Sequence, residues 1–262
     1  MPQISQRGTL MPASPIRKLV PLADEAKARG IHVYHLNIGQ PDLPMPKAAI
    51  DAIRGIDRKV LEYSPSQGYL SYRKKLVDYY KKYDINLTAD DIIITTGGSE
   101  AVLFAFLSCL NPGDEIIVSQ PCYVNYTPLA ELTKANVITI DSSVNGYYPS
   151  AEQIETACTP KTKALMICSP NNPTGTMIPR EELAKIAEVC KKHKIWVISD
   201  EIYCELAYDG SEHVSIGSFP GMKDYTIILN GFSKSFAMTG WRIGYIAAPS
   251  DLLVQIVKLH GY

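Results

Sequence analysis

The lysine at position 234 stands in a stretch whose composition favours a reactive amine over an ordinary surface charge. It lies in NGFSKSFAMTGWR, among small and aromatic residues, and no acidic residue occurs from position 225 to 250. Most lysines are solvated, but an amine drawn into a dry site has a lowered pKa and becomes nucleophilic. Arg242, eight residues further on, has a planar guanidinium suited to binding phosphate. The stretch therefore predicts an amine that condenses with a carbonyl group, close to an anion site.

Polar residues also follow three other apolar runs. Asp200 ends the run IWVISD, where a carboxylate is costly unless it is paired; it could cap the next segment or hold a cation such as a protonated ring nitrogen. The two asparagines of SPNNPTG could form a rigid turn or donate their amides to a ligand oxygen. The GGSE stretch, with Gly98 and then Ser99 as the expected N-cap of a helix, could be an ordinary turn or a phosphate site.

The hydrophobic pattern predicts the elements that would bring these residues together. Apolar, β-branched runs without internal alternation predict seven strands, at residues 91–96, 115–119, 137–140, 164–168, 195–199, 225–229 and 243–247. Helical spacing and caps predict helices at residues 47–53, 69–80, 123–133 and 181–192, one beginning at residue 99 and one opened by the capping box at residues 150–153. The first 45 residues are rich in proline and are expected to be irregular. Strands that alternate with helices indicate an α/β fold with a mostly parallel sheet flanked by helices.

Ligands of such sheets bind beyond the carboxyl ends of the strands, where the polar residues named above are expected to meet. They comprise a glycine turn for a phosphate, an aspartate, amide donors, the hydroxyl of Tyr203 in SDEIY, and the amine of Lys234. An enzyme that uses pyridoxal phosphate needs a lysine for a Schiff base, an anion for the pyridine nitrogen and a phosphate site. The sequence therefore predicts pyridoxal phosphate as cofactor.

Three stretches, SPNNPTG, SDEIY and NGFSKSFAMTGWRIGY, together resemble the class I and II aminotransferases, of fold type I among pyridoxal-phosphate enzymes. The resemblance runs from about SPIRKL to the end of the sequence. It implies a cytoplasmic homodimer of amino-acid metabolism or biosynthesis that moves an amino group between an α-amino acid and a 2-oxo acid, with aspartate as the first expected substrate. It also implies a cofactor-binding large domain at residues 46–262, and an N-terminal arm with part of a small domain at residues 1–45. The C-terminal remainder of that small domain is expected to be missing from this sequence.

The resemblance further implies a role for each matching residue. Lys234 would form the Schiff base and later carry a proton, Asp200 would pair with the pyridinium nitrogen, and Tyr203 would complete the catalytic set. The other cofactor contacts would come from Asn172 beside Tyr203 at the phenolic oxygen, Tyr123 on the ring face, and Gly98, Ser99, Ser233 and Arg242 at the phosphate. Tyr63, in EYSPSQGY, would reach the phosphate of a neighbouring subunit. Gly39, in NIGQPD, would lie with Asn172 near the substrate.

Other functions remain compatible with the same residues. A C–S lyase acting by β-elimination would use the same cofactor site, and a non-catalytic fragment could bind the cofactor without turnover. A nucleotide-binding protein is disfavoured because the glycine turn has neither a Walker nor a Rossmann pattern. A net charge of -1 disfavours nucleic-acid binding, and the longest apolar run, residues 101–107, is too short to span a membrane. The six cysteines have no CxxC spacing, so we expect reduced thiols and no metal site.

Overall fold

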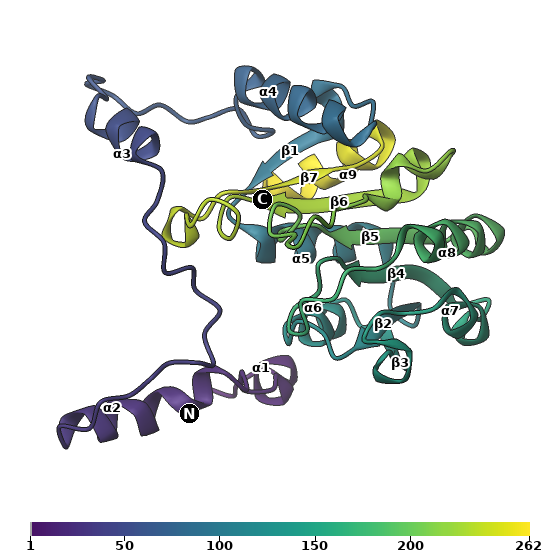
Figure 1. Cartoon of the computed structure of the whole chain (residues 1–262), viewed down its shortest axis with the longest axis horizontal. Helices are drawn as coiled ribbons and strands as arrows, with labels where there is room; N and C mark the ends of the chain where they lie inside the picture. The colour runs from purple at the N-terminus through teal and green to yellow at the C-terminus, as the bar shows by residue number, and fades with distance from the viewer. Residues whose placement is uncertain (1) are drawn as a thin grey trace.

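The computed structural model describes residues 2–262 and is built on one seven-stranded sheet (Figure 1). The sequence-predicted strands are all confirmed; their bounds are β1 (Ile92–Thr95), β2 (Glu115–Gln120), β3 (Asn136–Asp141), β4 (Thr162–Cys168), β5 (Trp196–Asp200), β6 (Thr226–Gly231) and β7 (Gly244–Ala247). Their order across the sheet is β1-β7-β6-β5-β4-β2-β3. The pairings are parallel except those of β7, which runs antiparallel to both β1 and β6. The mostly parallel α/β fold expected from the sequence is therefore present.

Helices cover both faces of this sheet. One face carries α5 (Gly98–Cys109), α6 (Tyr126–Leu132) and α9 (Ser250–His260), and the other carries α4 (Leu70–Tyr80), α7 (Ala151–Ala157) and α8 (Arg180–His193). Short 3-10 helices lie in the connections: η1 (Arg17–Leu19), η2 (Lys81–Tyr83), η3 (Ala89–Asp91), η4 (Ser143–Asn145), η5 (Ile216–Ser218), η6 (Met222–Tyr225) and η7 (Thr239–Trp241). The expected capping box at the start of α7 is confirmed. Helix α9 was not predicted from the sequence.

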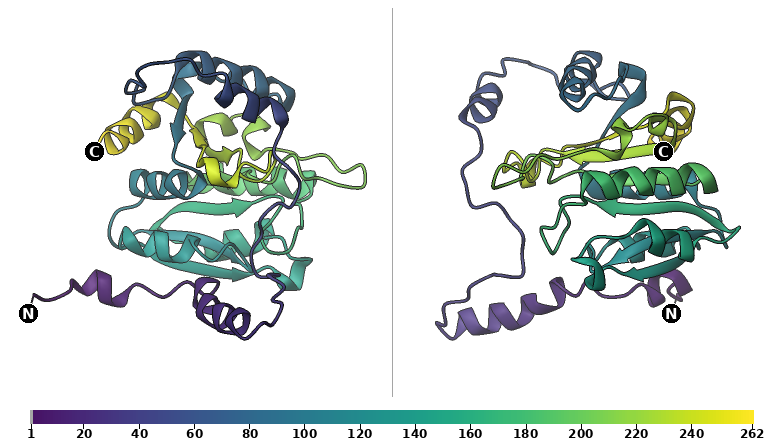
Figure 2. Two further views of the ribbon diagram at one scale, coloured as in Figure 1. Left: turned by 90° about the vertical axis from the view of Figure 1, so that its left-hand side faces the viewer. Right: turned by 45° about the vertical axis from the view of Figure 1, so that its right-hand side comes forward.

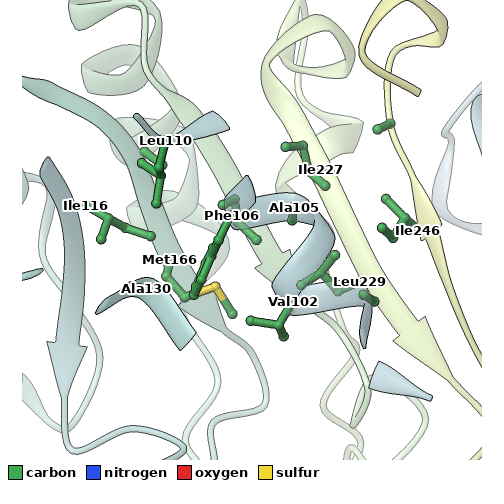
Figure 3. Close-up of a cluster of buried hydrophobic side chains, with 14 of the residues drawn as sticks. Val102, Ala105, Phe106, Leu110, Ile116, Ala130, Met166, Ile227, Leu229 and Ile246 are labelled. Carbon is green, nitrogen blue, oxygen red and sulfur yellow. The ribbon is translucent and has the colours of Figure 1, made fainter. Parts of the chain in front are cut away.

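Alternating side chains of the strands supply separate cores on the two faces of the sheet. Ile116 of β2 faces the α5 side, whereas Ile117 faces α7 and α8, as the twofold period of a strand requires. Figure 3 shows the first core, where the fully buried ring of Phe106 of α5 packs among strand side chains that include Met166 of β4. Burial of this apolar surface holds the strand ends in fixed positions, and the polar residues that follow the strands inherit those positions.

The N-terminal segment, residues 2–54, differs from the rest of the described chain. It contains α1 (Gln6–Leu10), α2 (Val20–Ala28) and α3 (Lys47–Arg54), and none of these helices has a buried residue. The expectation that the first 45 residues are irregular is thus wrong at α1 and α2. Helix α2 has a proline in its first turn, a favourable position, followed by the good helix formers of LADEAKA. Figure 2 shows the segment crossing beside the sheet with α1 and α2 held away from it.

Within residues 2–262 no helix has the length and apolar character needed to cross a membrane. Over the same residues there is no group of three or more His, Cys, Asp or Glu side chains that could hold a metal ion. The six cysteines are all unpaired.

Candidate active site

The register of the sheet brings the ends of β1 and β6 to the start of β7. Both Thr95 and Gly231 pair with Gly244. Residues that follow β1 and β6 therefore meet residues that precede the antiparallel strand β7. This meeting requires glycine, because a Cβ on Gly244 would lie 2.5 Å from the carbonyl carbon of Gly97 and 2.8 Å from the amide nitrogen of Gly98.

The turn between β1 and α5 forms a site suited to an anion. Helix α5 begins at Gly98, and its N-cap is Gly97, with φ +81°; the expectation that Ser99 is the N-cap is wrong, since only glycine readily adopts that backbone conformation. Ser99 is instead the second residue of the helix and is exposed. The first N–H groups of a helix lack intrahelical partners and attract negative charge.

A guanidinium stands beside this helix start. Arg242 follows η7, and its Nη1 donates to the carbonyl oxygen of Thr239 at 3.0 Å. A Cβ on Gly97 would collide with the Arg242 guanidinium, so the two groups are in close contact. Ser233, after β6, is buried. The carboxylate of Glu100 accepts the amide N–H of Thr96.

Asp200 ends β5 and is held by two hydrogen bonds. The hydroxyl of Tyr126 on α6 donates to Oδ2 at 2.7 Å, and the amide of Ile202 donates to Oδ1 at 3.1 Å. Burial raises the pKa of the Asp200 carboxyl to about 6, although both hydrogen bonds act to lower it. Lys234 also lowers this pKa, because its positive charge favours the ionised carboxylate. Asp200 is therefore ionised above about pH 6.

Lys234 lies after β6, and its amine reaches across to the N-terminal segment. Nζ donates to the carbonyl oxygen of Gly39 at 2.6 Å. The pKa of Lys234 is lowered, first by burial and then by the positive charge of Arg242, while Asp200 opposes the shift. The side chain is half-buried. More of this amine is thus neutral at a given pH than for a solvated lysine.

The remaining predicted ligand groups follow β5, β4 and β2, on the side of the sheet away from β6. Nδ2 of Asn172, after β4, donates to the hydroxyl of Tyr203 at 3.3 Å, so the two residues expected at one oxygen are in contact. The hydroxyl of Tyr123, after β2, accepts from Nδ2 of Asn125 at 2.8 Å. The ring of Tyr123 lies edge-on to that of Tyr126, with 5.4 Å between centroids. The structure thus gathers nearly all the predicted residues at one edge of the sheet.

Tyr63 is the predicted residue that the structure leaves apart. It lies in the connection between α3 and α4 and its side chain is fully exposed. Its expected partner is a phosphate in a neighbouring subunit, so its role stays a prediction.

Tyr126 is a residue that the sequence analysis missed. Its only sequence signal is its position three residues after Tyr123 in PCYVNY, one helical turn along the chain.

Glu201, next to Asp200, is buried, which the sequence did not indicate. Its Oε1 accepts from the hydroxyls of Ser199 at 3.1 Å and Ser215 at 2.6 Å, and Nε2 of His213 lies 3.3 Å from Oε2. This cluster closes the base of the loop that carries Tyr203.

Comparison with known proteins agrees with this geometry. Residues 31–261 match the family model described as aminotransferase class I and II. The chain belongs to this family. Over 235 residues it is 45% identical to a probable N-acetyl-LL-diaminopimelate aminotransferase of Bacillus subtilis, which covers 88% of this chain and 58% of that protein. It is 36% identical to an aspartate aminotransferase of the same organism, over 99% of this chain and 67% of that one.

Solved structures give the same fold. An aspartate aminotransferase from Thermus thermophilus, solved with maleate, superimposes with a TM-score of 0.93 at 33% identity, covering 100% of this chain and 68% of that chain. Among the curated relatives, the chain spans less than two thirds of the length of the first ones that it matches.

Class I and II aminotransferases depend on pyridoxal phosphate, and the residues present here fit that cofactor. The amine of Lys234 has a lowered pKa, and the ionisable carboxylate of Asp200 ends the neighbouring strand. The start of α5 with Arg242 offers both free N–H groups and a cation for a phosphate. The cofactor expected from the sequence therefore has a matching set of donors and acceptors.

Proposed function

We propose that this chain carries the cofactor-binding part of an aminotransferase in which Lys234 is the nucleophile. The observation that supports this most strongly is that Asp200 ends β5 and Lys234 follows β6, its neighbour in the sheet. An amine with lowered pKa and a carboxylate thus follow neighbouring strand ends, and each is affected by the charge of the other. The start of α5 with Arg242 offers an anion site. The activity would move an amino group between an α-amino acid and a 2-oxo acid.

Each residue contributes by position and charge. Gly98, Ser99, Ser233 and Arg242 would hold the phosphate, which fixes the depth of the cofactor in the crevice. Tyr123 would lie against the ring face, and the Asn172–Tyr203 pair would hydrogen-bond the phenolic oxygen. When bound, pyridoxal phosphate supplies an aldehyde for an amine and a ring that withdraws electrons from the substrate Cα.

Asp200 and Lys234 would then divide the proton chemistry. Ionised Asp200 would keep a proton on the ring nitrogen, because a negative charge within a few ångströms favours the charged form of its partner. Lys234, once the substrate amine has displaced it, would be a free amine with lowered pKa. It could then take a proton from the substrate Cα and carry it to another carbon of the bound pair. The carbonyl of Gly39 would guide Nζ, since it accepts an Nζ hydrogen at 2.6 Å.

The substrate is proposed from the relatives and not from a contact. The N-acetyl-LL-diaminopimelate and aspartate aminotransferases named above differ in substrate, and the Thermus enzyme was solved with maleate, a dicarboxylate. We keep aspartate as the first candidate. Glu100 directs its carboxylate to the amide N–H of Thr96. A β-eliminating C–S lyase would differ by releasing pyruvate and ammonia without a 2-oxo acid acceptor.

We also propose a cytoplasmic homodimer with the large domain at residues 46–262 and the arm at residues 1–45. The unpaired cysteines support a reducing compartment. The exposure of Tyr63 supports a subunit contact at that point, because an exposed aromatic ring is available to a second chain.

Borohydride reduction in the presence of pyridoxal phosphate tests the central assignment. We expect the cofactor to be fixed to Lys234, located by peptide mapping, and a visible absorption band that Lys234→Ala abolishes. Lys185→Ala, which removes an exposed lysine of α8, is the matched control and should leave the band in place. A label carried mainly on another lysine would refute the proposal.

A further inference from the structure

The carboxylate of Asp200 has one side-chain hydrogen-bond donor within the described chain, the hydroxyl of Tyr126. Tyr126 is 1% exposed, and its hydroxyl lies 2.7 Å from Oδ2. The other hydrogen bond to Asp200 comes from the backbone of Ile202, which any residue could supply.

We propose that Tyr126 is a positioning residue that keeps Asp200 ionised and fixes the direction of its carboxylate at the end of β5. This inference rests on the proposed function, because it assigns a task to the same carboxylate. Nothing in the sequence motifs gave Tyr126 a role, and the residue does not touch the amine.

The hydroxyl of Tyr126 can act only as a donor to an ionised carboxylate. Burial, followed by the charge of Asp200, raises the pKa of Tyr126 well above its ordinary value, so the phenol keeps its proton. A donated hydrogen bond stabilises the charged form of an acid. Without it, the carboxyl would be left in a buried setting with only a backbone donor.

The other titratable groups facing Asp200 are Cys168 of β4, Glu201, Tyr203 and Lys234. Burial raises the pKa of Cys168 and of Tyr203, so both remain neutral. Glu201 disfavours the charge on Asp200, whereas Lys234 favours it. Lys234 would cease to be a fixed cation during the proposed reaction, when its amine must be neutral. Tyr126 is then the side chain that continues to stabilise the Asp200 charge.

The position of Tyr126 follows from its helix. It is the first residue of α6, and α6 packs on the α5 face of the sheet with Ala130 in the same core. The ring therefore cannot withdraw without disturbing that core, and the hydroxyl holds Oδ2 at a fixed point.

The test measures Asp200 directly, in the chain without cofactor. The γ-carbon of labelled aspartate is followed by ¹³C NMR against pH, and Asp200→Asn identifies the Asp200 signal. We expect a midpoint near pH 6 in the unchanged chain and a midpoint higher by about one pH unit or more in Tyr126→Phe, as loss of a hydrogen bond to a charged group implies.

Tyr80→Phe is the matched control. Tyr80 is equally buried, and its hydroxyl donates to Tyr245 at 3.3 Å and not to Asp200. This variant should lose a buried tyrosine hydroxyl of the same kind and leave the Asp200 midpoint unchanged. Equal midpoints in Tyr126→Phe and the unchanged chain would overturn the proposal, as would an equal shift in both tyrosine variants.

A second readout does not depend on the variant folding. With ¹³C at the tyrosine ζ-carbon, the Tyr126 signal of the unchanged chain should move with the same midpoint as Asp200, while the Tyr80 signal should not. A Tyr126 signal that stays constant through the Asp200 titration would also overturn the proposal. Failure of the borohydride experiment would refute the proposed function alone, since these titrations contain no cofactor.

Discussion

The N-terminal segment and the sheet edge contribute to the candidate site in opposite ways. The sheet edge supplies Asp200, Lys234 and Arg242 from connections anchored in two buried cores. The N-terminal segment supplies one backbone oxygen, that of Gly39, and its helices bury no residue. Chemistry that needs fixed geometry thus lies on the packed body, whereas the segment can only be positioned by what it touches.

The apolar side chains of the two regions show the same contrast. Phe106 in α5 is fully buried, while Leu36 in the segment is 95% exposed. Several other large apolar side chains of the segment are also exposed. Such a surface is typical of one that another chain or domain covers. The comparison predicts that stability resides in the body, and that the segment gains order from a partner surface.

The largest expected effect is on stability of the body. Phe106→Ala should lower the free energy of unfolding by about 3–5 kcal/mol, because it leaves a cavity in the core. Leu36→Ala should change it by less than about 0.5 kcal/mol. Denaturant unfolding measured side by side checks this pair, and a similar loss in both variants would contradict the contrast between the regions.

Alanine substitution at Gly244 and at Gly39 should give a smaller difference in stability, again with the larger loss in the body of the protein. In Gly244→Ala the new Cβ would meet the backbone of Gly97 and Gly98, and we expect a loss of about 1–3 kcal/mol with weaker binding of pyridoxal phosphate. In Gly39→Ala the Cβ meets no atom within 4 Å, so stability should be nearly unchanged. Thermal melting and absorbance titration are the measurements. A Gly244→Ala variant as stable as the unchanged chain would show that β7 and the turn before α5 need not approach closely.

The smallest expected effect is the pH dependence due to Asp200. Its pKa rises from 3.8 to about 6 on folding, so the folded chain binds more protons than the unfolded chain between these values. Stability should therefore fall as pH rises from about 4 to 6. Asp200→Asn should lack this fall. The difference between the two proteins should reach about 1–2 kcal/mol, reduced from the full shift because the carboxylate is partly exposed. An equal pH dependence of the free energy of unfolding in the two proteins would contradict this prediction.

Local sequence patterns predicted most of the fold because strands and helices have short periods. The seven strands, α8 and the capping box at Ser150 each follow from spacing within one segment. Local patterns misassigned Ser99, because the choice of N-cap was decided by the close approach of β7 to Gly97. Local patterns also failed to predict α2 and α9, because no strong motif marks the helical spacing there.

The sequence by itself determined which chemical groups end each strand, and hence Lys234, Asp200 and the cofactor type. Only the tertiary structure decided how those groups are held. The bond from Tyr126 to Asp200 joins residues 74 positions apart, and that from Lys234 to Gly39 joins residues 195 apart. Periodicity describes neighbours within a few turns, whereas such contacts depend on strand order and helix packing, which no local pattern contains.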